Sequence, residues 1–352
     1  MISRIQYAMQ GNAPVLSSCI RGALSELTLK AAKQAGISPD EIMVASIVGN
    51  TAMHHMLLEI DPSPLTVPPY MPAVSEALCI PPEGILPICP AGIIRVLPNI
   101  AGFVGADTVG CLLSTRLDQM DDLTLMIDIG TNGEMVLGNK KHRIACSTAA
   151  GPAFEGAKIE CGMRGAPGAV DHVTLVQNQI DFHVIGDSGA QGLCGSGLLD
   201  LIAVLLKTGT ISESGRMESG NVFYLEGTSV YLTQKDVREV QLAKAAIRAG
   251  IELMCRAMKV QVSDIRRALL AGAFGNYLDP KSACAIGMIP PILHDRIIPI
   301  GNAAGEGARL AALSEKEYEC SRTLASETEF LELASMPDFN DCYVDCLCFE
   351  EA

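Results

Sequence analysis

The segment from residue 125 to residue 136 carries the residue types best suited to chemistry. An apolar run with strand character delivers one carboxylate, Asp128, and a glycine-flanked turn follows it, formed by Gly130, Thr131, Asn132 and Gly133. Glycine has no Cβ to obstruct a ligand, so successive N–H groups of such a turn can surround a phosphate chain. We therefore expect the turn to bind phosphate and Asp128 to hold Mg²⁺ through water. The alternative is an ordinary Asn-Gly hairpin.

Three further glycine-rich stretches accompany this hairpin, at residues 97–107, 269–276 and 299–308. Together the four segments resemble, in order, the first connecting helix, the second phosphate loop, the adenosine loop and the second connecting helix of the actin, sugar kinase and heat-shock-chaperone ATPase superfamily. The resemblance implies an α/β, ribonuclease H-like, two-lobed ATPase fold. The two connecting helices are rich in Gly and Ala, which allows a close crossing at a hinge.

The same resemblance assigns nucleotide contacts to two further groups. The adenosine loop contributes four residues: Gly272, Ala273, Phe274 and Gly275. Lys244 and Arg248, one turn apart on a predicted helix, match positions where relatives place cationic side chains along adenine and ribose. The alternative for these two cations is a solvated helix face.

A narrower resemblance covers nearly the whole chain. The segments 48–55, 128–134, 149–156, 194–200 and 242–247 are similar to the C-terminal domain of reductive activators of corrinoid proteins. That family implies ATP and Mg²⁺ as cofactors, a corrinoid methyl-transfer protein as partner, and reduction of its cobalt from Co(II) to Co(I).

Two features of the family are absent from this sequence. No Asp-x-Gly-Thr motif precedes Ile47, so we expect the first lobe to be incomplete at its N-terminus and its first phosphate loop to be missing. No Cys-x2-Cys occurs either, so the [2Fe-2S] cluster is expected only in a missing N-terminal domain. This chain is then the ATPase and partner-binding core of an activator. One alternative is a non-catalytic, partner-binding fragment whose own ATPase activity is uncertain.

A second alternative is an ATP-dependent activator of a 2-hydroxyacyl-CoA dehydratase. In that family two subunits share a [4Fe-4S] cluster, and Cys194 would correspond to one of the cysteines that ligate it. A lone cysteine at a helix start is more often a small buried hydrophobe. Similarly, Cys342, Cys346 and Cys348 have the spacing of a thiolate site, but the aromatic residues among them favour packing.

The remaining candidates each have a structural alternative. Glu155 follows a glycine loop and is a candidate to polarise the attacking water or to order Mg²⁺. The alternative is a glutamate favoured at a helix N-terminus. Ser147 and Thr148, beside that loop, are candidates to face the partner's corrinoid. His54 and His55 are adjacent on a helix and point about 100° apart, so we expect packing or hydrogen bonding.

The elements that position these residues follow from hydrophobic periodicity and from breakers. We expect helices at 17–35, 51–57 and 197–207, a helical stretch after Asn99, and a long helix opened by Thr233 and Asp236 as a capping box. Strands are expected at 42–48, 123–129, 134–137, 144–148, 173–176, 180–185 and 268–271. The second to fourth of these are expected to form a three-stranded meander. Ten of the nineteen prolines lie between Pro62 and Pro98, which argues against central strands there.

These elements suggest three parts. Residues 1–98 form a partial first lobe with a proline-rich connection, 99–325 a second lobe with the phosphate and adenosine loops, and 326–352 a C-terminal extension that packs back on the first lobe.

The composition excludes several classes of function. The 352 residues include 26 Lys and Arg against 40 Asp and Glu, a net charge of −14, which argues against nucleic-acid or anionic-membrane binding. No signal peptide or membrane-length apolar stretch is present, so we expect a cytoplasmic protein whose thirteen cysteines are mostly thiols. A homodimer is possible.

Overall fold

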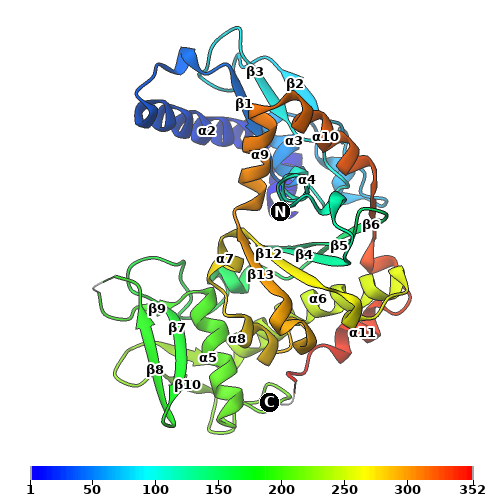
Figure 1. Cartoon of the computed structure of the whole chain (residues 1–352). Coiled ribbons are helices and arrows are strands. Elements are labelled where there is room, and N and C mark those ends of the chain that lie inside the picture. The colour runs from blue at the N-terminus through cyan, green and yellow to red at the C-terminus, as the bar shows by residue number, and fades with distance from the viewer. Residues whose placement is uncertain (1, 187, 351–352) are drawn as a thin grey trace. The chain divides into compact units, whose positions relative to one another are not determined.

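The computed structural model describes residues 2–186 and 188–350, which fold into two compact units (Figure 1). Unit 1 consists of Met1–Met120, Asn139–Ala145 and Asn302–Phe330, and unit 2 of Asp121–Gly138, Cys146–Gly301 and Leu331–Ala352.

Unit 1 combines six helices of its described residues with a small sheet. The helices are α1 (Ile2–Tyr7), α2 (Ala13–Ala35), α3 (Thr51–Leu58), α4 (Ala106–Thr115), α9 (Ala303–Leu313) and α10 (Glu315–Ser326). The sheet has the order β1 (Val44–Ile47), β3 (Ile93–Val96), β2 (Leu78–Ile80). In addition, β14 (Thr328–Phe330) pairs in parallel with Arg143–Ala145. Helix α2 begins four residues earlier than expected, because a proline occupies its first turn, and it ends as expected at Gly36 with φ +70°.

The proline-rich segment contains a central strand, contrary to the expectation from sequence. Strand β3 pairs with β1 in parallel on one side and with β2 in antiparallel on the other. It fits into the proline-free interval between Pro90 and Pro98, where Ile94 and Val96 are almost completely buried. The number of prolines in the segment did not reveal that this interval is long enough for a strand.

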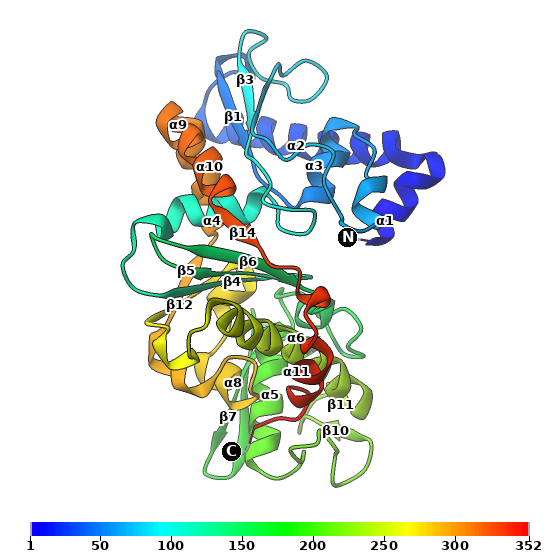
Figure 2. The same ribbon diagram turned by 90° about the vertical axis from the view of Figure 1, so that its right-hand side faces the viewer.

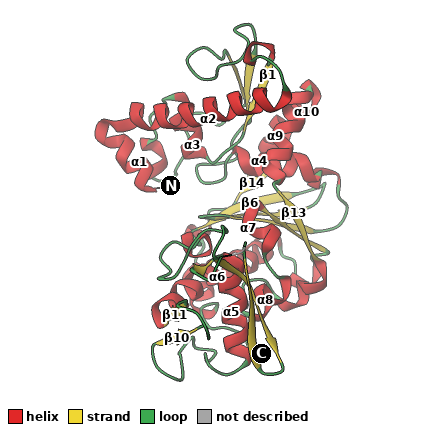
Figure 3. Cartoon of the chain, turned by 90° about the vertical axis from the view of Figure 1, so that its left-hand side faces the viewer, coloured by secondary structure: helices red, strands yellow, loops and turns green. Residues whose placement is uncertain are grey.

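Helices α4 and α9 cross at very short range (Figure 1, Figure 3). A Cβ atom built on Gly307 would lie 2.0 Å from the carbonyl oxygen of Gly110, and one on Gly110 would lie 2.8 Å from that of Ala304. The expected close crossing of small residues is therefore present. Helix α4 starts later than the sequence suggested, because residues 99–105 form a loop.

Unit 2 is built on four neighbouring strands in the order β13 (Ile297–Gly301), β12 (Arg267–Ala271), β4 (Thr124–Ile129), β5 (Gly133–Gly138). Strand β6 (Arg143–Thr148) runs from unit 1 into unit 2. A second sheet has the order β8 (Gln179–Val184), β7 (Ala169–Val176), β9 (Gly192–Leu193), and β10 (Val222–Tyr224) pairs with β11 (Tyr231–Thr233). The helices are α5 (Gly195–Lys207), α6 (Gln234–Met258), α7 (Gly272–Tyr277), α8 (Pro280–Ala285) and α11 (Phe339–Asp345).

Two features of unit 2 place the candidate site. Strands β4 and β12 are parallel neighbours, with Asp128 opposite Ala271, so their carboxyl ends lie together. The expected capping box opens α6: Thr233 and Asp236 exchange hydrogen bonds between side chain and backbone N–H at 3.2 and 2.8 Å. This 25-residue helix then carries a long buried face.

The C-terminal segment from Leu331 onward belongs to unit 2, whereas the sequence analysis expected residues 326–352 to pack back on the first lobe. Helix α11 lies against α6 (Figure 2). Asp338 forms an ion pair with Arg256 at 2.6 Å, and the Tyr343 hydroxyl donates to the Leu242 carbonyl at 3.3 Å. The lobe boundaries at residues 98 and 325 remain a prediction, since compact units and lobes are different divisions.

No helix among the described residues is long and apolar enough to cross a membrane. All thirteen cysteines are free thiols, as expected.

Candidate active site

The hairpin between β4 and β5 places its polar groups at one end of the sheet. Asp128 lies opposite Glu134, and the Gly130 N–H donates to the Asn132 carbonyl at 2.9 Å to close the turn. The Asn132 amide donates to the Glu134 carboxylate at 3.3 Å. Residues directly opposite each other share one face of a sheet, so two carboxylates stand beside the turn.

Glu155 is brought to this turn from the following glycine loop. It ends the short helical turn Pro152–Glu155, and its carboxylate accepts a hydrogen bond from the Thr131 hydroxyl at 2.7 Å. Both side chains are exposed. The structure therefore joins two residues that the sequence predicted separately, and an exposed carboxylate at this point can accept a proton from a water molecule.

The adenosine loop begins directly beside Asp128. Gly272 follows β12 with φ +88°, and a Cβ atom there would lie 2.6 Å from Oδ1 of Asp128. Glycine is thus required both by the backbone conformation and by the close approach of the carboxylate. Gly275 is also packed closely, with its Cβ position 3.3 Å from Leu270. The predicted side-chain roles of Ala273 and Phe274 lie outside the described residues.

The oxygen donors at this point suit Mg²⁺. The carboxylates of Asp128 and Glu134 and the hydroxyl of Thr131 are hard ligands, and magnesium in nucleotide sites commonly takes one or two carboxylates and completes its shell with water and phosphate. Among the described residues no group of three or more His, Cys, Asp or Glu side chains has the geometry of a metal site. The phosphates and water would therefore supply most of the ligands, with Asp128 as the principal protein contact.

Thr148 lies between the hairpin and helix α6. Its hydroxyl donates to the Gly133 carbonyl at 3.2 Å, and its methyl group approaches Gly250 of α6. It is 5% exposed, so this geometry does not turn it toward a partner, in contrast to the prediction. Ser147 is half-buried on the same strand, and its predicted role stays a prediction.

Lys244 and Arg248 are occupied by the C-terminal segment. The Lys244 ammonium donates to the Cys348 carbonyl and lies 5.4 Å from the ring centre of Phe349, and burial lowers its pKa to about 8. Arg248 binds the carboxylates of Glu350 and Glu252. Both cations thus have partners in the C-terminal segment, and their predicted contacts with adenine and ribose stay a prediction.

The motif around His54 has a structural role in unit 1. The Asn99 amide donates to Nδ1 of His54 at 2.5 Å, while its carbonyl oxygen accepts the Ala106 N–H that starts α4. His55 donates from Nδ1 to the Thr51 carbonyl at 2.8 Å. Burial lowers the pKa of His54 to about 4, and neighbouring His55 adds to that shift. The expected hydrogen-bonding role is confirmed.

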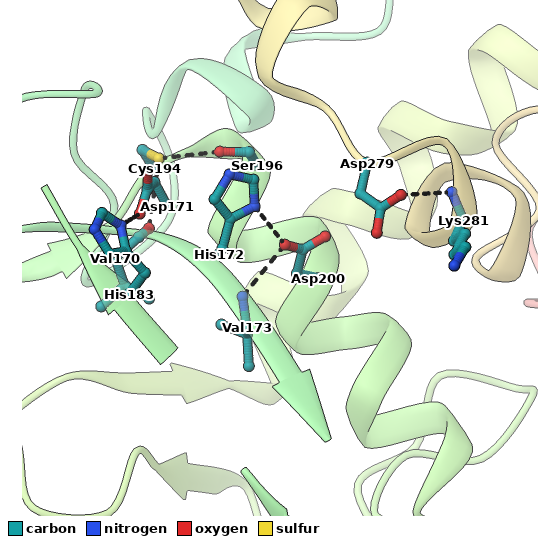
Figure 4. A network of polar contacts seen from close by, with 10 residues as sticks. All are labelled: Val170, Asp171, His172, Val173, His183, Cys194, Ser196, Asp200, Asp279 and Lys281. Atoms are coloured by element: carbon teal, nitrogen blue, oxygen red, sulfur yellow. Dashed lines mark hydrogen bonds and ion pairs between the residues drawn. The ribbon is translucent and has the colours of Figure 1, made fainter. Parts of the chain in front are cut away.

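The segment 194–200 forms a second polar network in unit 2 (Figure 4). Asp200, 3% exposed, accepts hydrogen bonds from the Val173 N–H and from Nδ1 of His172, both at 3.2 Å. Burial raises the pKa of Asp200. Cys194 is buried and directs its thiol to the Val170 carbonyl at 3.4 Å, which agrees with a packing role.

Sequence reasoning missed Glu134 as a member of the site. The signal was available, because the residues two positions before and two positions after a three-residue hairpin loop lie opposite each other. The sequence analysis also did not predict the hydrogen bond between Thr131 and Glu155.

A carboxylate and a glycine-flanked turn at the end of one strand, beside a glycine loop at the end of its parallel neighbour, are the arrangement expected of the ASKHA fold. Residues 122–352 match the family described as the C-terminal domain of RACo, the ASKHA domain, and residues 1–120 match the RACo middle region. The chain belongs to this family, and the expected fold is confirmed.

Individual relatives agree with this assignment. The chain is 37% identical to the corrinoid activation enzyme RamQ of Eubacterium limosum, over 98% of this chain and 63% of that protein. It is 29% identical to the [Co(II) methylated amine-specific corrinoid protein] reductase of Methanosarcina barkeri, over 71% of this chain and 50% of that protein. A solved reductive activator for corrinoid,iron-sulfur protein matches with a TM-score of 0.89 and 35% identity, over 99% of this chain and 59% of that one. The chain thus spans about three fifths of RamQ and of the solved activator.

Proposed function

We propose that this chain is the ATP-binding and partner-binding core of a protein that returns the cobalt of a corrinoid protein from Co(II) to Co(I). The observation that carries the proposal is the contact between Asp128 and the Gly272 position. It unites the phosphate hairpin and the adenosine loop at the carboxyl ends of two parallel strands, where α/β folds bind nucleotides.

The chain's own residues have distinct tasks in this proposal. The N–H groups of the 130–133 turn bind phosphate, Asp128 orients the hydrated Mg²⁺, and Glu155 positions the attacking water and accepts its proton. Thr131 holds the Glu155 carboxylate in place through the 2.7 Å hydrogen bond. ATP, when bound, supplies the free energy for an otherwise unfavourable reduction.

The electron has to come from outside these 352 residues. The cysteine spacing lacks a [2Fe-2S] motif, and the buried thiol of Cys194 does not suit a cluster shared with a second subunit. We assign the one-electron donor to a [2Fe-2S] centre elsewhere and the acceptor to Co(II) in the partner. The partner type follows from the names of the relatives.

Titration calorimetry with ATP and Mg²⁺ tests the nucleotide site. The proposal expects saturable binding that Asp128→Ala removes and Asp118→Ala leaves unchanged, since Asp118 lies in unit 1. Equal binding by both variants and the parent would refute the assignment of Asp128.

A second candidate is a partner-binding module without turnover. It is favoured by the presence of a single Asp-x-Gly-Thr motif in the chain, at Asp128, because this superfamily grips phosphates between two such loops. ATP hydrolysis separates the candidates: nucleotide binding without phosphate release, with and without a corrinoid protein, supports the module.

A further inference from the structure

An open groove on unit 2 lies at the start of α6. Its volume is about 640 Å³, and it is lined by the β10–β11 hairpin, by Glu160 and by the first turns of α6. No residue of the proposed ATP site borders it. Most of its lining side chains are exposed, whereas small-molecule sites enclose most of their ligand. The shape therefore suits a segment of another chain better than a small molecule.

The aromatic part of the groove is set by strand register. Tyr224 and Tyr231 lie opposite each other, so they share one face of the hairpin, with ring centres 5.6 Å apart. The next pair in the register, Phe223 and Leu232, occupies the opposite face, and Leu232 is completely buried. Tyr224 is 63% exposed. An exposed tyrosine that a half-buried neighbour, here Tyr231, holds in place is a typical anchor residue of protein interfaces.

The charged part of the groove comes from the first turns of α6. Lys235 and Arg238 are three residues apart, so they lie on one helix face. Both are exposed, and neither has an ion-pair partner among the described residues. Two unpaired cations side by side are unusual in a chain whose net charge is −14.

The acidic groups nearby are already engaged. Glu160 accepts a hydrogen bond from the Tyr231 hydroxyl at 3.3 Å, and Glu239 forms an ion pair with Lys158 at 3.4 Å. Asp236 is buried in the capping box. Glu160 keeps its negative charge, so the residues that line the groove carry two cations against one carboxylate, beside an aromatic surface.

The groove is also held in shape before any partner arrives. The Gln234 amide donates to the Gly215 carbonyl at 2.7 Å and its oxygen accepts the Met217 N–H at 2.8 Å. The Glu160 N–H donates to Asp236 at 2.9 Å. A preformed surface loses little entropy on binding.

We propose that this groove, formed by Tyr224, Tyr231, Lys235 and Arg238, docks an acidic segment of a protein partner that also carries an aromatic side chain. Carboxylates of the partner pair with the two cations, and its aromatic ring packs on Tyr224. The proposal stands independently of the ATP site.

Fluorescence anisotropy tests it with a fluorescein-labelled peptide of six glutamates around one phenylalanine. A peptide with glutamine in place of every glutamate is the ligand control. The expected result is saturable binding of the acidic peptide, weakened at least tenfold by Lys235→Glu with Arg238→Glu and reduced at high salt. Tyr224→Ala, at an exposed position, weakens it as well.

The matched control is Lys207→Glu with Arg266→Glu, which changes the net charge by the same amount at two other exposed cations of unit 2. It should leave binding within twofold of the parent. Absence of binding to the parent, equal binding of the glutamine peptide, or equal losses in both double variants would each overturn the proposal.

Discussion

Replacing Gly272 with alanine isolates the contact on which the proposed nucleotide site depends. The new Cβ would lie 2.6 Å from Oδ1 of Asp128, whereas ordinary van der Waals contact begins near 3.4 Å, so the carboxylate has to move by about 0.8 Å. A displacement of that order at a reacting or binding group costs roughly 10- to 100-fold. The backbone at φ +88° adds a stability cost of about 1–2 kcal/mol for a residue with a Cβ.

The matched control is Gly209→Ala, also in unit 2. Gly209 has φ +68°, but no atom lies within 4 Å of its Cβ position, so alanine there incurs only the backbone cost. We expect similar losses of unfolding free energy in the two variants by urea titration. Calorimetry should then show Mg-ATP affinity reduced at least tenfold in Gly272→Ala and unchanged in Gly209→Ala. Parent-like affinity in Gly272→Ala, or an equal loss in Gly209→Ala, would refute the reasoning.

Three further predictions address the proton acceptor, the helix crossing and the buried histidine. Glu155→Gln should lower ATP hydrolysis about 100-fold, as expected for loss of a general base, without changing thermal stability, and unchanged turnover in a phosphate-release assay would remove Glu155 from the mechanism. Gly307→Ala should destabilise the protein by about 1–3 kcal/mol through overpacking against Gly110. The control Gly22→Ala, with open space around it in α2, should stabilise the protein by up to about 1 kcal/mol. If urea unfolding shows changes of the same sign in the free energy of unfolding of both variants, the crossing geometry is contradicted. His54 has a pKa of about 4 in the folded protein against 6.5 in the unfolded chain. Below pH 6.5 the unfolded chain therefore binds more protons, and the free energy of unfolding falls by up to about 3 kcal/mol by pH 4. His54→Gln should flatten this part of the curve of unfolding free energy against pH, and an unchanged slope would mean that other groups cause the pH dependence.

The hairpin around Asp128 could be predicted from the sequence because its determinants are local. An apolar run, a glycine-flanked turn and a second apolar run specify the register by themselves. The order of the four glycine-rich segments then placed the adenosine loop beside it, and the Gly272 contact agrees with that order. The capping box of α6 was equally local.

The contacts that the sequence did not predict are those that distant segments make. Lys244 and Arg248 bind a carbonyl and a carboxylate of residues about one hundred positions later in the chain. No local sequence pattern predicts that the C-terminal segment packs against α6. Strand β3 was missed because the prolines around it are dense, although Ile93–Val96 itself is proline-free and apolar apart from Arg95.

The most direct test of the account follows cobalt itself. The protein that carries this chain is mixed with a Co(II) corrinoid protein, a reduced [2Fe-2S] donor and Mg-ATP, and formation of Co(I) is recorded by its visible absorption and by loss of the Co(II) paramagnetic resonance signal. The account predicts Co(I) only when ATP is present, and none with a folded Asp128→Ala variant. Co(I) formation without ATP, or at the parent rate in Asp128→Ala, would contradict it.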